Sequence, residues 1–227
     1  MDDHGRQSRR EFLKKSAVAG AVTWAAPAIT TLSGGRAWAQ QYPTPCECTA
    51  HAYGLFLRIP DLNIATTVDC LSQINIVNDP PGPTNVRVTG VLVCGTSTEN
   101  GTCTAQATVT SLDVRVTVGL VALPRIRADV LTSEVSVTCP GCEFASSGEV
   151  VKLRIGQGIT LVEVQVTGAP NQQVSALGLS IIINEERCVD GTLERNALHV
   201  SSPLLGGVDL IVSHAEVTGQ GCTCPAA

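Results

Sequence analysis

Hydrophobic and polar residues alternate with a period of two along most of the chain after residue 50. Aliphatic and β-branched residues occupy every second position in segments 51–59, 84–94, 104–123, 126–139, 149–155, 159–168, 177–187, 195–202 and 208–217. No window keeps the period of an amphipathic helix, and this alternation is typical of strands with one buried face. The sequence therefore predicts an all-β protein of about nine or ten strands.

Clusters of Gly, Pro, Asn and Asp separate these segments. Examples are the stretch 79–83, Asn100-Gly101, Asp190-Gly191 and Gly206-Gly207. Such residues favour tight turns, so consecutive strands are expected to pair antiparallel. No low-complexity linker divides the chain. We predict a single antiparallel β-sandwich or barrel-like double sheet.

The alternation changes phase within two of the longer segments. Ile126, Ala128 and Val130 share one face, and after a slip at Leu131 the alternation resumes in a new phase. A slip of this kind indicates a β-bulge. In segment 104–123 the strand is expected to continue or bend at Ser111.

The N-terminus has the pattern of an export signal. A weakly hydrophobic run, 17–32, is broken by Pro27 and is followed by Ala37-Trp38-Ala39, a small-x-small cleavage site. A membrane anchor would need about 20 apolar residues, so we predict removal of a signal helix by cleavage between Ala39 and Gln40. The motif S-R-R-x-F-L-K predicts export of the folded protein by the twin-arginine translocase; it comprises Ser8, Arg9, Arg10, Phe12, Leu13 and Lys14.

Cleavage changes the charge of the chain. Six of the fifteen Lys and Arg residues and three of the twenty acidic residues precede Gln40, which leaves nine basic and seventeen acidic residues and a formal net charge near −8. Phosphate backbones are bound by clustered Lys and Arg, so a nucleic-acid partner is not expected. Four aromatic residues remain, too few for a platform that stacks sugars: Tyr42, Tyr53, Phe56 and Phe144.

All ten cysteines follow the cleavage position. An even number in an exported chain predicts up to five disulfides, which would reinforce a core that has few aromatic side chains. We expect Cys94 to pair with Cys103 across the Asn100-Gly101 turn, and a double clip between the chain ends, Cys46 and Cys48 with Cys222 and Cys224. The connectivity of the remaining four stays open: Cys70, Cys139, Cys142 and Cys188.

A metal-binding or redox protein is the alternative reading of the same cysteines. The spacings Cys-Glu-Cys, Cys-Pro-Gly-Cys and Cys-Thr-Cys would suggest zinc or an iron–sulfur cluster in a cytosolic protein. Twin-arginine export carries folded proteins, so the compartment alone does not decide between the two. Because no second ligand pair lies near Cys139, disulfides are favoured, and no metal or cofactor is expected.

The β-region resembles the choice-of-anchor P proteins, which are secreted bacterial β-domains. The resemblance rests on "AYGL", "VTGAPNQQVSALGLSIIINEE" and "NALHV...LLGGVDLIVSHAEV", which occur in this order between residues 52 and 217. It implies an exported or cell-surface domain and no established activity. The final "GQGCTCPAA" is neither an LPxTG-type sorting signal nor a hydrophobic tail, so free secretion or non-covalent attachment is expected.

The resulting organisation has four parts. Residues 1–39 are the signal peptide, 40–51 a Cys-containing segment, 52–218 the choice-of-anchor P-like β-domain, and 219–227 a Cys-containing tail. The predicted role is that of a structural or interaction module at the cell surface or outside the cell. Its partner is unknown, and a cell-envelope or other surface protein is the candidate.

Two histidines in the closing hairpin are candidates for a site. Alternation would put His199 on the face of Ala197 and Ser201, and His214 on the face of Val212 and Glu216. Register would separate the two histidines by about 10 Å, too far to bind one metal, and they need not share a face.

A secreted enzyme using either histidine is a second alternative. His214 with Glu216, or His199 with Asp209, could act as a general base. Against this reading, there is no G-x-S-x-G elbow and no D-x-D-x-D-G calcium loop. The adjacent Glu185 and Glu186 would point to opposite faces as a solvated strand end. We therefore predict histidines bonded to neighbouring groups and no catalysis.

Overall fold

The computed structural model of the protein describes residues 47–70, 73–78, 84–118, 121–139 and 141–224. The chain divides into two units, Met1–Gln40 and Gln41–Ala227, and all described residues belong to the second unit. The twin-arginine motif, the cleavage position between Ala39 and Gln40, and Cys46 lie outside the described residues. The expectations about them remain predictions.

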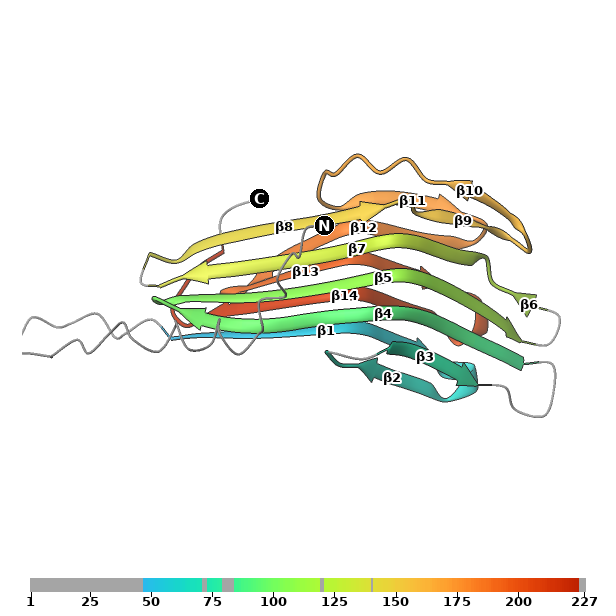
Figure 1. Ribbon diagram of the computed structural model, residues 1–227, viewed down its shortest axis with the longest axis horizontal. Coiled ribbons are helices and arrows are strands. Elements are labelled where there is room, and N and C mark those ends of the chain that lie inside the picture. The colour runs from blue at the N-terminus through green and yellow to red at the C-terminus, as the bar shows by residue number, and fades with distance from the viewer. Residues whose placement is uncertain (1–46, 71–72, 79–83, 119–120, 140, 225–227) are drawn as a thin grey trace, which may run out of the picture. The chain divides into compact units, whose positions relative to one another are not determined.

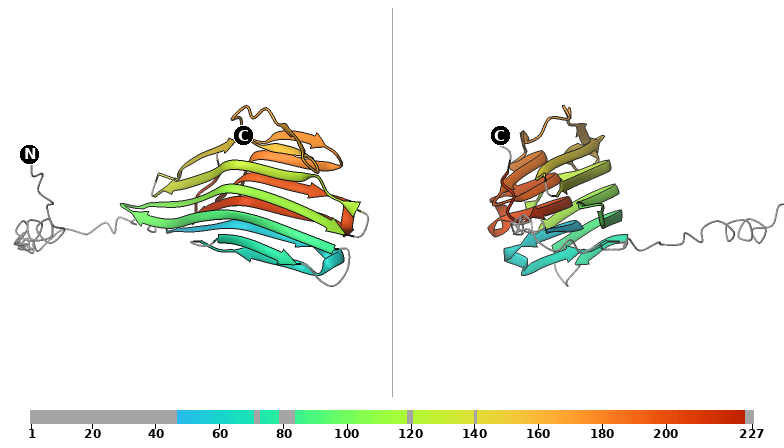
Figure 2. Two further views of the ribbon diagram at one scale, coloured as in Figure 1. Left: turned by 45° about the vertical axis from the view of Figure 1, so that its right-hand side comes forward. Right: turned by 90° about the vertical axis from the view of Figure 1, so that its left-hand side faces the viewer.

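Two antiparallel β-sheets pack face to face (Figure 1), and Figure 2 shows the two layers from other directions. This arrangement confirms the predicted β-sandwich. Sheet A has the strand order β11 (Gln172–Ala176), β12 (Leu179–Val189), β13 (Thr192–Ser202), β14 (Val208–Gly219), β1 (Cys48–Ile59), β2 (Ile64–Val68). Sheet B has the order β10 (Thr160–Glu163), β9 (Arg154–Gln157), β7 (Arg125–Thr138), β5 (Thr102–Val118), β4 (Thr84–Glu99), β3 (Gln73–Asn78), with β6 (Val121–Ala122) on β5 and β8 (Glu143–Val151) on β7.

The edges of the sheets are where the sequence was least informative. The strands β2, β3, β10 and β11 form the four edges of the two sheets, and three of them, β2, β3 and β11, were not predicted. The segment 159–168 forms a strand only over Thr160–Glu163, and Val162 in it is 66% exposed. An edge strand pairs on one side and buries few side chains, so its alternation is weak.

The long strands bend at mid-length, as β4, β5 and β7 show in Figure 1, and the bend reverses which side of a strand faces the core. In β7, Ile126 is buried before the bend and Leu131 after it, which confirms the predicted change of phase. The register of β7 with β5 does not shift there, so the change is not the predicted bulge. A register shift occurs instead between β4 and β5, at Thr89/Val91.

Neighbouring strands bend at positions that lie side by side in the register. Four of these positions are non-glycine residues with positive φ: Ser111 (56°), Lys152 (50°), Asn184 (52°) and Ser213 (57°). A residue in this conformation turns two successive stretches of alternation out of phase. The predicted bend at Ser111 is confirmed. We call the row the bend line: Gly54, Ser213, Ala197 and Asn184 in sheet A, and Ser111, Asp129 and Lys152 in sheet B.

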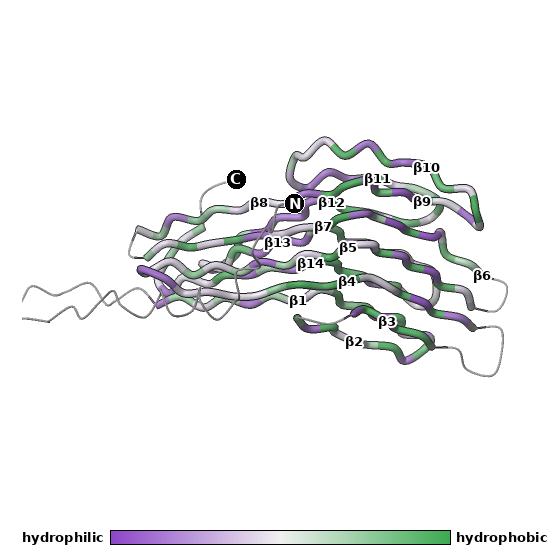
Figure 3. The backbone as a smooth tube through the Cα atoms, in the orientation of Figure 1, coloured by the Kyte–Doolittle hydropathy of each residue, from purple (hydrophilic) through white to green (hydrophobic). Residues whose placement is uncertain are grey.

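The interior of the sandwich holds two hydrophobic cores that meet near the bend line, and Figure 3 shows the alternation of hydropathy that builds them. The larger core consists mainly of Leu, Ile and Val, and the smaller one mainly of Ala, Val and Cys. Between them the sheets are joined by hydroxyl groups. Ser133 Oγ donates to the carbonyl of Ser213 (2.7 Å), and Ser213 Oγ donates to the carbonyl of Ala107 (2.8 Å).

All nine cysteines of the described residues are disulfide-bonded. Three of the four described bridges connect sheet A or the segment following one of its strands to sheet B: Cys48–Cys103, Cys70–Cys94 and Cys142–Cys222. The fourth, Cys188–Cys224, ties the C-terminal tail to β12. At least one cysteine of each described bridge belongs to the smaller core described above or packs against it.

The predicted pairing of Cys94 with Cys103 is wrong. The turn itself forms as expected, with φ of 50° at Asn100 and 77° at Gly101. Because the turn has only two residues, Cys103 lies opposite Thr98, and Cys94 lies four positions farther along its strand. The two cysteines of one hairpin thus bond to other strands.

The predicted double clip between the ends is also wrong for Cys48, Cys222 and Cys224. The ends do meet, since Gln220 N donates to the carbonyl of Glu47 at 2.8 Å. Cys48, however, bonds across the sandwich to β5, and the C-terminal cysteines bond to the segment before β8 and to β12. Proximity of two chain ends does not fix which strand each side chain faces.

Gly54→Ala is expected to destabilise the fold at the bend line. A Cβ at this position would lie 2.1 Å from Leu92 Cδ2, in a buried region. Overpacking of this kind should lower the free energy of unfolding by roughly 1–3 kcal/mol, measured by urea denaturation. Gly95→Ala is the control, because a Cβ there meets no atom within 4 Å. An equal loss in both variants would contradict the close approach.

Removal of a cross-sheet bridge should cost more stability than removal of the tail bridge. Cys48→Ala/Cys103→Ala opens a link spanning 55 residues beside the smaller core, and Cys188→Ala/Cys224→Ala one spanning 36 residues. The first double variant is expected to lose roughly 2–4 kcal/mol of unfolding free energy and the second less. Thermal and urea denaturation of the two variants test this order, and a larger loss in the second would overturn it.

Candidate functional site

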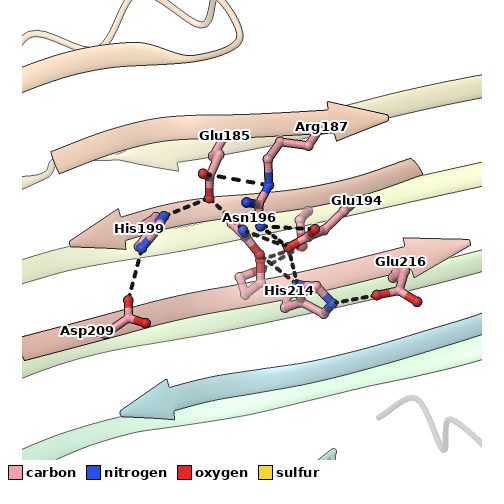
Figure 4. A network of polar contacts seen from close by, with 10 residues as sticks. Glu185, Arg187, Glu194, Asn196, His199, Asp209, His214 and Glu216 are labelled. Atoms are coloured by element: carbon pink, nitrogen blue, oxygen red, sulfur yellow. Dashed lines mark hydrogen bonds and ion pairs between the residues drawn. The ribbon is translucent and has the colours of Figure 1, made fainter. Parts of the chain in front are cut away.

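The outer face of sheet A carries a network of polar side chains from four adjacent strands (Figure 4). The bend line creates it, because the reversal of phase leaves residues three positions apart on one face. Asn196 and His199 thus both point outward from β13, and Ala197 between them is buried. In β14, His214 also points outward, directly after the buried Ser213 at the bend.

His199 lies between two carboxylates. Its Nδ1 is 2.9 Å from Glu185 Oε2, and its Nε2 is 2.9 Å from Asp209 Oδ1. Glu185 is 6% exposed and comes from β12, and Asp209 comes from β14. The side chain of His199 is 23% exposed. The contact of His199 with Asp209, considered in the sequence, is therefore present, and Glu185 adds a second partner.

These contacts favour the charged forms of the central pair. The hydrogen bond to Glu185 is the largest cause that raises the pKa of His199, and it outweighs the opposing effect of burial. Burial would raise the pKa of Glu185, but hydrogen bonds from His199 and Asn196 together lower it. The two contacts thus favour an imidazolium form of His199 between two carboxylates.

His214 is in a different state. Burial is the largest cause that lowers its pKa, to about 4. The ring stacks on Tyr53, with centroids 4.2 Å apart and planes inclined by 16°. His214 Nδ1 donates to Asn196 Oδ1 at 2.7 Å, and His214 Nε2 is 3.7 Å from Glu216 Oε2. His214 is therefore a neutral, buried ring that contributes packing and one strong hydrogen bond.

Asn196 joins the two histidines. Its Nδ2 donates to Glu185 Oε2 at 2.7 Å, and its Oδ1 accepts from His214. Glu194 completes this part of the network, since it accepts from Arg187 at 3.0 Å. The chain of contacts thus runs from Asp209 through His199, Glu185 and Asn196 to His214, as Figure 4 shows.

The faces predicted for the two histidines need correction. His199 does not share a face with Ala197, nor His214 with Val212, because Ala197 and Val212 are fully buried. The two histidines do share the outer face of sheet A, and His199 lies opposite Ile211 in the register, three positions from His214. The expected separation along the strands is correct, and the bend explains the error in the faces.

The expectation about Glu185 and Glu186 can also be compared with the structure, as can the places of two buried hydroxyls in the closing hairpin. Glu185 and Glu186 do point to different sides, but Glu185 is buried and Glu186 binds Arg195 at 2.6 Å, so they are not a solvated strand end. Ser202 Oγ donates to the carbonyl of Gly178. Together with the internal bonds of Ser213, this leaves the hydroxyls serving the fold rather than a nucleophile–base pair.

The cysteines and histidines offer no metal centre in the described part of the chain. No group of three or more His, Cys, Asp or Glu residues is placed there to hold a metal ion. In the Cys-Pro-Gly-Cys motif, Cys142 bonds to Cys222 at a separation of 80 residues, and Cys139 is also disulfide-bonded. A cysteine used in a structural bridge is not available as a thiolate ligand.

Asn196, Glu185 and Tyr53 were missed as members of the site. An apolar run of isoleucines hides the reversal just before Glu185, and nothing local to the sequence shows that Tyr53 pairs with His214. The spacing of Asn196 and His199 was the available signal. Residues on one face of a regular strand lie an even number of positions apart, so two polar residues three positions apart can share the outer face only if the strand bends between them.

Comparison with known proteins gives no match, since no family model, curated protein or solved structure is similar to the chain. Within the described ranges, no helix has the length and apolar character needed to cross a bilayer.

Glu185→Gln is expected to lower the pKa of His199, because it removes the carboxylate whose hydrogen bond is the largest cause that raises this pKa. An NMR titration of the imidazole measures the shift. Glu216→Gln is the control, since Glu216 lies 3.7 Å from His214 and belongs to its side of the network. A His199 titration that is the same in Glu185→Gln and wild type would contradict the assignment.

The same pair predicts a pH dependence of stability. The raised pKa of His199 stabilises the fold fully below 6.5, its ordinary value, and this contribution is lost as pH rises through the folded pKa. The lowered pKa of Glu185 stabilises the fold above 4.5 and loses its effect as pH falls through the folded pKa. The difference in stability between wild type and Glu185→Gln should therefore be largest between these two values.

Proposed function

We propose that the protein is an exported, disulfide-stabilised β-domain with a structural or interaction role outside the cytoplasm. The observation that carries the proposal is that all nine cysteines of the described residues are disulfide-bonded, and that three bridges join the two sheets. Such bridges form and persist in oxidising compartments. The twin-arginine motif supports the same compartment and makes the twin-arginine translocase the partner during export.

We propose membership of the choice-of-anchor P proteins on the residues that carry the resemblance. The segment "NALHV...LLGGVDLIVSHAEV" contributes to the hairpin of β13 and β14 in the middle of sheet A, and "AYGL" belongs to β1 beside it. These are the strands that carry the bend line and the histidine network. The characteristic residues thus have structural roles here, which supports a family defined by its architecture and a location at the cell surface.

A non-catalytic role is favoured by the state of the site. His199 is held between two carboxylates, which raise its pKa, and His214 is 3% exposed. A general base needs a free lone pair that reaches a substrate proton. Both ring nitrogens of His199 are hydrogen-bonded to carboxylates, and burial keeps His214 away from a substrate, so we assign both histidines to stability.

The intact mass of the secreted protein tests the proposal. We expect a mass that begins at Gln40, no metal lost on denaturation, and a gain of about two daltons per bridge on reduction, for up to five bridges. Cys188→Ala/Cys224→Ala is the control, and its mass gain on reduction should correspond to one bridge fewer. Retention of residues 1–39 in the exported protein would contradict the predicted cleavage. Alkylation of most thiols without reductant, together with loss of a metal mass on denaturation, would refute the structural role of the cysteines.

A further inference from the structure

Six of the nine basic residues that follow Gln40 gather on the outer face of sheet B at the end that holds the larger core. We call them the basic patch: Arg87, Arg115, Arg125, Arg127, Lys152 and Arg154. They come from β4, β5, β7, β9 and the residue at the bend between β8 and β9. The sequence gives no sign of this gathering, because the six residues are spread over 68 positions of an acidic chain.

The patch places like charges directly opposite each other. Arg87 is the register partner of Arg115, and Arg127 is the partner of Arg154. Like charges at directly opposed positions destabilise a sheet. Two such arginine pairs lie on one face of a chain that has an excess of acidic residues. Stability does not explain this arrangement of like charges.

Internal ion pairs neutralise only part of the patch. Asp113 contacts Arg115 at 3.1 Å, Arg125 at 2.5 Å and Arg127 at 3.6 Å. Asp129 pairs with Lys152 at 3.3 Å and also with Arg154.

Glu163 lies opposite Arg154 in the register, and Arg87 has no ion pair among the described residues. Among the residues that the structure describes, three acidic residues therefore face the six basic ones, which leaves a net charge of +3.

We propose that the basic patch is a binding surface for an acidic polysaccharide, a polymer that carries carboxylates at regular intervals. The binding surface is argued from the charges of the patch alone. Only the choice of a polymer found outside the cytoplasm rests on the proposed function.

The composition of the patch favours carboxylates. Five of its six members are arginines, whose planar guanidinium forms paired hydrogen bonds with a carboxylate. Asp113 shows the geometry, since its two oxygens accept from Nε and Nη2 of both Arg115 and Arg125. A carboxylate of a uronic acid presents the same two oxygens to Arg87 and Arg127.

The surroundings of the patch suit a saccharide more than a lipid surface or a neutral glycan. Register places Asn75 and Thr89 in line with Asp113, and Asn85 opposite Thr117 on the same face. Amides and hydroxyls of this kind bond to sugar hydroxyls. Neutral sugars are usually held by stacking on aromatic rings, of which the chain has few, so recognition here depends on charge.

A second copy of this chain fits the patch less well. The acidic residues of the outer face of sheet A are the natural complement, but they are already used within the protein. Glu185 accepts from Asn196 and contacts His199, and Glu194 accepts from Arg187. Their transfer to a partner's arginines would break the network described above.

The experiment is binding of the purified oxidised protein to immobilised polygalacturonate in about 50 mM salt, where surface charges are weakly screened. We expect binding that weakens as salt rises, and no binding to dextran, a neutral glucan. Arg87→Glu should weaken binding about tenfold and reduce the salt dependence. Arg58→Glu is the matched control, since Arg58 is an exposed arginine on the outer face of sheet A, and it should change affinity by less than about twofold.

Lys152→Glu provides a second variant, because this side chain is 61% exposed and its replacement leaves the core untouched. Absence of binding at low salt, or an equal loss in Arg87→Glu and Arg58→Glu, would overturn the proposal. Tighter binding to polyphosphate or duplex DNA than to polygalacturonate, with the same dependence on Arg87, would overturn the assignment to a carboxylated polymer. The intact mass tests the proposed function separately, so failure of one does not imply failure of the other.

Discussion

The structure depends on a bend that all the central strands make at the same place. A strand that continued its alternation past the bend line would turn its polar side chains to the core. Each strand must therefore change the side that faces the core at the position where its neighbour does so. Gly54 allows the close approach of Leu92, and Ser111, Asn184 and Ser213 adopt left-handed backbone in the middle of strands. In the pairs β12–β13, β13–β14 and β5–β7 the shared position keeps the register continuous through the bend, whereas β4 and β5 shift by one residue at Thr89/Val91.

The bend also explains why the disulfides lie where they do. It separates a large core of aliphatic side chains from a small one in which Ala105, Ala107 and Ala215 take the place of larger residues. Small side chains bury little area, and so they contribute little hydrophobic free energy. Cys48–Cys103 and Cys142–Cys222 connect the sheets at this weaker end, where constraint of the unfolded chain has the greatest relative effect.

The sequence predicted what depends on local alternation and missed what depends on register between distant strands. The phase slip at Leu131 and the bend at Ser111 are visible because polar residues mark both sides of the strand there. The three residues before Asn184 and the three before Ser213 are all apolar, so the alternation is lost just before each reversal, and the common face of the two histidines was hidden. The prediction of the cysteine pairs failed for the same reason. The register between distant strands decides on which face a thiol lies and which cysteine it can reach.

The two outer faces of the sandwich use charge in opposite ways. On sheet A, carboxylates, histidines, an arginine and an asparagine bond to one another, and buried members such as Glu185 face partners within the protein. On sheet B, three acidic residues face the six basic ones of the basic patch, and Arg87 lies opposite another arginine. Overall composition, with its excess of acidic residues, argues against any anionic partner. Composition averages over the surface, whereas binding depends on one face, and on this face the balance of charge is reversed.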